Sequence, residues 1–107
     1  MWVVKRNGLR EPFDRAKVVE GVRSACKNRP VTDEQMEQLA QEVEDALRAQ
    51  TSEPTSQQVG VAVLERLKAL DDVAYLRFAS VYKGFEEAGD FQREAGLLTK
   101  TTEPKRK

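Results

Sequence analysis

The dipeptide Asn7-Gly8 is the feature that most restricts how this chain can fold. It lies between two short runs of strand-forming residues, and Asn-Gly is the strongest local hairpin signal because a type I′ turn needs positive φ at both central positions. The sequence therefore predicts a β-hairpin over residues 2–12. Pro12 fits only at the end of a strand because it has no N–H to donate. Asp14 can accept the free N–H groups of a helix that begins just after it, so the hairpin should lead directly into a helix.

Charged side chains gather at this predicted junction. Lys5 and Arg6 lie near the hairpin tip, Glu11 lies near the end of the hairpin, and Lys17 lies in the first turn of the helix. A cation in a first turn faces the positive end of the helix dipole, at a cost of a few tenths to about 1 kcal/mol, and a bound anion would remove that cost. Three cations and one carboxylate suit a ligand that consists of a polyphosphate and a polar head group. The alternative is that the three cations are simply solvated.

The two commonest glycine-rich phosphate loops, G-x-x-x-x-G-K-[ST] and G-x-G-x-x-G, do not occur in the sequence. Side chains must therefore bind phosphate, and a helix predicted to start at Thr55 can add backbone N–H donors and the Ser56 hydroxyl. Gly60, within the first two turns of that helix, costs about 1 kcal/mol relative to alanine. It therefore suggests the close approach of another group, which is either a bound ligand or a neighbouring helix.

Hydrophobic periodicity and capping signals predict the other elements. Thr32-Asp33-Glu34-Gln35 and Thr55-Ser56-Gln57-Gln58 both have the pattern of a capping box. Helices are expected over residues 14–28, 32–50, 55–69, from 71 or 72 to about 85, and 88–98, with a disordered tail over 99–107. The predicted fold class is α+β, with an N-terminal β-hairpin lidding a bundle of about four helices, plus a short C-terminal helix.

The fourth predicted helix carries an aromatic stripe, for which a place in the core is the more common role. Its members are Tyr75, Phe78, Tyr82 and Phe85. Tyr82 and Lys83 are kept as an exception, because the ring is a candidate to stack on a base while the neighbouring lysine reaches phosphate.

The pattern Val-x-Lys-Arg-x-Gly from Val3, followed by Glu-x-Phe-x-x-x-Lys-Val from Glu11, resembles the opening of the ATP-cone. This small nucleotide-sensing domain occurs in ribonucleotide reductases and in the bacterial transcriptional repressor of their genes. Residues 21–31 and 72–85 are similar to the repressor's version of the cone. The resemblance covers about residues 2–98 and implies an ATP-cone domain over 2–87.

The resemblance also implies a site for ATP and dATP, with Mg²⁺ accompanying the nucleotide. By this resemblance, Val3 and Val18 line the adenine pocket, Glu11 and Asp14 hydrogen-bond the base or sugar, and Ser56 and Gly60 lie at the nucleotide. Where a reductase cone can carry a histidine, this chain has Gly60. The full predicted nucleotide-binding set is Val3, Lys5, Arg6, Glu11, Phe13, Asp14, Lys17, Val18, Ser56, Gly60, Tyr82 and Lys83.

The repressor family carries a zinc ribbon ahead of the cone, and that ribbon contributes to DNA binding. This chain has one cysteine and no histidine, so zinc binding is not possible because a structural site needs several thiolate or imidazole ligands. Met1, followed at once by a strand, leaves open a chain cut after the ribbon or a free-standing cone. With 18 cations, 18 anions and net charge zero, the chain is expected to reach DNA only through the missing ribbon.

Composition restricts the remaining function classes. The length of 107 residues fits one domain, and the absence of a signal peptide or a long apolar run predicts a cytoplasmic protein without a membrane role. Without histidine, a nucleophile elbow or an evident carboxylate pair confined to a cleft, catalysis is not expected. The leading hypothesis is a repressor's sensor, in which the bound nucleotide sets the association of a homo-oligomer. The alternatives are the regulatory cone of a ribonucleotide reductase large subunit and a helical protein-interaction module without a ligand.

Overall fold

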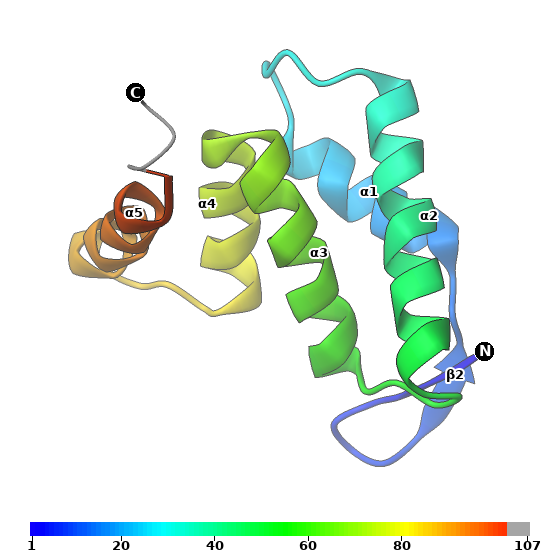
Figure 1. Cartoon of the computed structure of the whole chain (residues 1–107). Coiled ribbons are helices and arrows are strands. Elements are labelled where there is room, and N and C mark those ends of the chain that lie inside the picture. The colour runs from blue at the N-terminus through cyan, green and yellow to red at the C-terminus, as the bar shows by residue number, and fades with distance from the viewer. Residues whose placement is uncertain (103–107) are drawn as a thin grey trace.

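A computed structural model of the chain describes residues 1–102, and the side chains of residues 1–98. Two short strands are followed by five helices: β1 Trp2–Val4, β2 Arg10–Pro12, α1 Arg15–Ala25, α2 Asp33–Gln50, α3 Ser56–Leu70, α4 Asp72–Tyr82 and α5 Ala88–Thr102. Helices α1 to α4 pack together, the hairpin lies at one end of them, and α5 lies on the outer side of α4 (Figure 1). The predicted α+β class is confirmed.

The hairpin forms as expected, but its turn differs from the prediction. The strands are antiparallel, with Val3 opposite Glu11, and the Gly8 N–H donates to the Lys5 carbonyl at 2.9 Å. Gly8 has a φ of 87°, whereas Asn7 is not among the described residues with positive φ. The predicted type I′ turn is therefore wrong. Three residues, Arg6 to Gly8, form the loop, and only the glycine needs the left-handed region, as in the three-residue hairpin loops that close with a glycine bulge.

The helices begin where the capping residues predicted. Asp14 accepts from the Ala16 N–H, and Thr32 and Thr55 form complete capping boxes with Gln35 and Gln58. Each box satisfies N–H groups that have no partner inside the helix.

Two helices end earlier than expected because of the residues that follow them. Helix α1 ends at Ala25 rather than near residue 28, and Asn28 then takes a φ of 62° and reverses the chain. Helix α4 ends at Tyr82 because Gly84, at a φ of 68°, stops it. Helix α5 continues to Thr102, four residues beyond the expected end. The rest of the expected tail, residues 103–107, lies outside the described residues.

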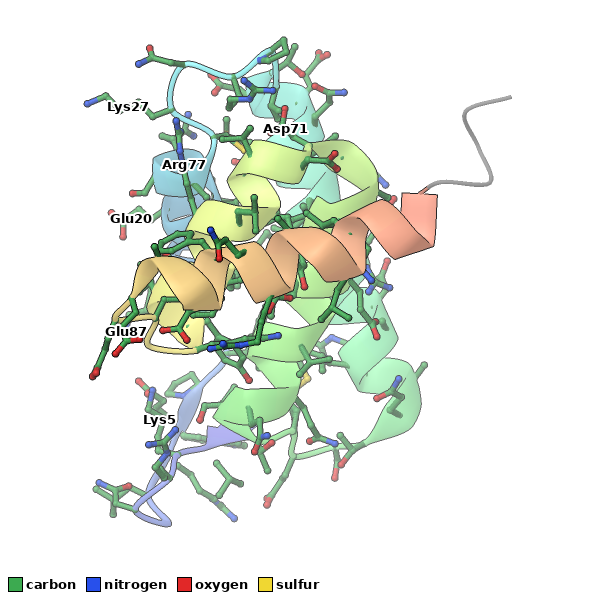
Figure 2. All side chains as sticks on the ribbon, turned by 90° about the vertical axis from the view of Figure 1, so that its left-hand side faces the viewer. Lys5, Glu20, Lys27, Asp71, Arg77 and Glu87 are labelled. Carbon is green, nitrogen blue, oxygen red and sulfur yellow. The ribbon has the colours of Figure 1, made fainter. Side chains whose placement is uncertain are left out.

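The core lies between α1, α2, α3 and α4. Its fully buried side chains include Val22, Val43, Leu47 and Leu67. The aromatic stripe belongs mainly to this core: Tyr75 is buried, and Phe78, Tyr82 and Phe85 pack against it. At the end of the bundle away from the hairpin, the Arg77 guanidinium donates to the Lys27 carbonyl at 2.6 Å (Figure 2). This bond fixes the end of α1 against α4.

Helices α3 and α4 approach closely at Gly60. A Cβ atom placed on Gly60 would lie 2.0 Å from Cε1 of Tyr82, far inside van der Waals contact. The Tyr82 hydroxyl donates to the Gln57 carbonyl at 2.8 Å, which holds the ring over α3. Gly60 is therefore required by the packing of two helices.

We predict that Gly60→Ala destabilises the fold by about 1 to 3 kcal/mol, because the added methyl group overpacks against the Tyr82 ring. Gly96→Ala is the matched control, since Gly96 also lies in a helix and nothing lies within 4 Å of an added Cβ. That control should leave the protein as stable or stabilise it by up to about 1 kcal/mol. Urea unfolding of both variants measures the difference, and equal stability of the two would contradict the packing role of Gly60.

Candidate functional site

The hairpin is joined to the start of α3. The Val4 N–H donates to the Pro54 carbonyl at 2.9 Å, and Val4 forms a parallel bridge with Thr55. Pro54 is fully buried, so this attachment point is fixed by the surrounding core. The bridge brings Lys5 and Arg6, which follow β1 directly, to the first turn of α3.

Two cavities flank this junction. The larger, of about 770 Å³, is lined by Val4, Lys5, Arg6, Thr55, Ser56, Gln57, Tyr82 and Lys83. The smaller, of about 140 Å³, is lined by Val3, Lys5, Glu11, Pro12, Phe13, Asp14, Lys17, Val18, Ser56 and Val59. Lys5 and Ser56 line both cavities, so one extended ligand could reach from one to the other.

The carboxylate of Glu11 lies between two lysines. It is 2.8 Å from Nζ of Lys5 and 3.7 Å from Nζ of Lys17. The hydrogen bond from Lys5 and the charges of both lysines hold the pKa of Glu11 below its ordinary value. Both lysines stay substantially exposed, and Arg6 forms no ion pair with any residue that the structure describes. The cations are therefore accessible to an anion from solvent (Figure 2 shows Lys5 beside the hairpin).

The smaller cavity has an apolar wall. Val3 is buried in the hairpin, and Phe13 and Val18 pack against the core while still lining the cavity. The Asp14 carboxylate lies at the edge of this wall, but its Oδ1 already accepts from the Ala16 N–H at 3.0 Å. A flat heterocycle could lie against the wall with its polar edge near Glu11 and Asp14.

Lys83 lines the larger cavity from the end of α4. Its Nζ lies 3.2 Å from both carboxylate oxygens of Glu94, a buried residue of α5. The other candidate on α4, Tyr82, lines the same cavity but is held by Gly60 and Gln57. Tyr82 and Lys83 therefore both line the cavity, and each also contacts another residue of the chain.

The predicted site residues come together with one exception. All of them line one of the two cavities except Gly60, which lines neither. Of the two explanations offered for Gly60, the structure supports the neighbouring helix, because the close group is the Tyr82 ring. That Gly60 also lies at the ligand stays a prediction.

Sequence reasoning missed several lining residues: Val4, Pro12, Thr55, Gln57 and Val59. Thr55 and Gln57 carried a usable signal, since residues around the start of a helix lie beside any anion bound there. Nothing in the sequence indicated Val4, because its position depends on the bridge to Thr55.

The other large grooves are chemically different. One of about 440 Å³ between α2 and α3 is lined by Glu34, Glu42 and a single cation, Arg66. Within residues 1–102, no helix is long and apolar enough to span a membrane, and no three or more His, Cys, Asp or Glu side chains are grouped as metal ligands.

A family model described as the ATP cone domain matches residues 1–88. The chain is 62% identical over 96 residues to the transcriptional repressor NrdR of Acidothermus cellulolyticus, which covers 89% of this chain and 56% of the relative. It is 50% identical over 104 residues to that of Corynebacterium efficiens, covering 96% and 67%. It is 59% identical over 97 residues to that of Mycobacteroides abscessus, covering 90% and 63%. The chain thus spans about 56 to 67% of the length of these relatives.

We predict that the protein binds inorganic tripolyphosphate and that Lys5→Ala weakens this binding by about 10-fold or more, the effect of one charged hydrogen bond. Lys27→Ala is the control, because this substitution removes the same charge while Lys27 lies at the other end of the molecule (Figure 2). Isothermal titration at one salt concentration measures both. Equal losses in the two variants would mean that the anion is attracted by overall charge and has no site at the hairpin.

Proposed function

This chain belongs to the ATP-cone family, and we propose that it binds ATP and dATP at the two cavities joined by Lys5 and Ser56. The convergence of three cations with the first turn of α3 supports this proposal most directly. In it, the adenine lies against Val3, Phe13 and Val18, and the phosphates extend toward Lys5, Arg6 and Lys17. The N–H groups and the Ser56 hydroxyl at the start of α3 add donors for phosphate oxygens.

Glu11 gives this site a defined exchange of partners. Without ligand, its carboxylate holds Lys5 and Lys17 close together. When those lysines turn to phosphate, the carboxylate becomes free to accept hydrogen bonds from the base or the ribose. Mg²⁺ is the expected companion of the nucleotide, because it binds phosphates together with one or two carboxylates and keeps several waters.

We further propose that the chain is the nucleotide-sensing part of a transcriptional repressor of ribonucleotide reductase genes, and not an enzyme. The curated relatives are named transcriptional repressor NrdR, which favours this assignment over the regulatory cone of a reductase. In the proposed mechanism, the bound nucleotide sets how protomers associate, and association governs DNA binding. DNA contact is assigned to a zinc ribbon, for which these 107 residues hold too few metal ligands. Their net charge is zero, so they carry no surplus of cations for binding DNA phosphates.

We predict that ATP with magnesium binds the protein and that Lys17→Ala weakens this binding by about 10-fold or more, since a charged hydrogen bond contributes about 1.5 to 3 kcal/mol. Glu37→Gln is the control, because Glu37 is an exposed acidic residue of α2 and lines neither of the two cavities. Isothermal titration measures both affinities. A Lys17→Ala protein that binds ATP as tightly as the wild type would remove Lys17 from the phosphate site.

We also predict that the oligomeric state depends on which nucleotide is bound. A nucleotide shifts an association equilibrium only through its different affinity for the two states, and coupling of about 1 to 3 kcal/mol is typical. Light scattering on the nucleotide-free, ATP-bound and dATP-bound protein, at matched concentration and salt, measures the mass of each form. Three identical masses, both here and with a ribbon-containing chain, would leave a binding domain without a switch.

A further inference from the structure

The side chain of Lys83 connects the larger cavity to α5. Lys83 lies directly after the last residue of α4 and lines the cavity together with Lys5 and Arg6. Its ammonium group lies 3.2 Å from both carboxylate oxygens of Glu94, and its side chain is 40% exposed. A partly exposed lysine can turn from one anion to another without moving the backbone.

Glu94 depends on a small number of partners. It is 6% exposed, and the Tyr75 hydroxyl donates to its Oε2. Burial alone would raise the pKa of Glu94, but the hydrogen bonds from Tyr75 and Lys83, together with the charges of Lys83 and Lys68, outweigh burial and hold the pKa below its ordinary value. Burial of the ring and the same carboxylate raise the pKa of Tyr75 to about 12, so the phenol stays a donor. A buried carboxylate that loses a cationic partner becomes unfavourable.

Helix α5 lies across the outside of the bundle, with α4 as its main packing partner (Figure 2). Besides the Glu94 contacts, Phe91 packs edge-on against Phe85 with ring centroids 5.0 Å apart, and Leu98 reaches the core. Loss of the Lys83 contact should therefore loosen α5 without detaching it.

We propose that the nucleotide phosphates and Glu94 compete for the Lys83 ammonium, so that nucleotide binding loosens α5 from α4. This proposal rests on the nucleotide site proposed above. Phosphate in the larger cavity offers Lys83 a second anion, and the departure of Lys83 leaves Glu94 with the Tyr75 hydroxyl and the weaker attraction of the Lys68 charge. By thermodynamic reciprocity, whatever releases Lys83 from Glu94 also strengthens nucleotide binding.

The first test is hydrogen exchange on the unmodified chain, with ATP and magnesium at saturation and without them. Amides of α5 over residues 91–98 should exchange faster in the bound protein, while amides of α2 serve as the internal reference. Unchanged or slower exchange in α5, at concentrations where titration shows ATP bound, would overturn the coupling while leaving the nucleotide site intact. No ATP binding at all would overturn the proposed function and the coupling with it.

The second test uses Glu94→Gln, which removes the charge that holds Lys83 but keeps an acceptor for the Tyr75 hydroxyl. This variant should bind ATP about 5-fold more tightly or better, the lower end of ordinary allosteric coupling, and its α5 exchange should no longer respond to ATP. Glu87→Gln is the matched control, because Glu87 lies just before α5 and is exposed (Figure 2). Equal affinity gains in the two variants would reduce the effect to a general loss of negative charge and overturn the proposal.

Tyr75→Phe separates the release of Lys83 from a loose helix. This variant removes the hydroxyl that binds Glu94 and leaves the Lys83 pair in place. It should speed exchange in α5 without raising ATP affinity. A gain in affinity equal to that of Glu94→Gln would show that any loosening of α5 is enough, and would contradict competition for Lys83.

Discussion

The backbone hydrogen bond between Val4 and Pro54 is the contact on which the candidate site depends. Two strands of three residues cannot hold a stable position in water by themselves. Bridging β1 to the residue before α3 places the tip of the hairpin over the first turn of a helix. That first turn has unpaired N–H groups and a positive dipole end. One interaction therefore brings a cationic loop and a helix N-terminus to the same cavity.

The positive charge at this junction is partly offset within the protein itself. Glu11 sits between Lys5 and Lys17, which would otherwise lie close together and repel each other. The cost of gathering cations is therefore reduced before a ligand arrives. A phosphate must compete with a carboxylate for these lysines, and an anion of low charge competes less well than a polyphosphate. The arrangement favours ligands that carry several negative charges.

Local signals in the sequence were sufficient to predict where the hairpin and the helices lie, because capping and turn residues act over four or five positions. Thr32, Thr55 and Asp14 marked helix starts correctly, and Asn7-Gly8 marked a hairpin although the type of turn was wrong. Contacts between distant segments were not predictable in this way. The role of Gly60 required the position of Tyr82, and the roles of Val4 and Glu94 required a bridge and a buried ion pair that no periodicity reveals.

The attachment of the hairpin has a consequence for how the site can be tuned. Because β1 and β2 are short and contribute few contacts, local opening of the hairpin should cost less free energy than unfolding of the helical bundle. An apparent affinity is reduced by the fraction of molecules in which the binding state is not formed. Substitutions near Pro54 could then change ligand affinity without touching a ligand, by altering how often the hairpin is in place. Related chains could set their response thresholds through the stability of this attachment while keeping every lysine unchanged.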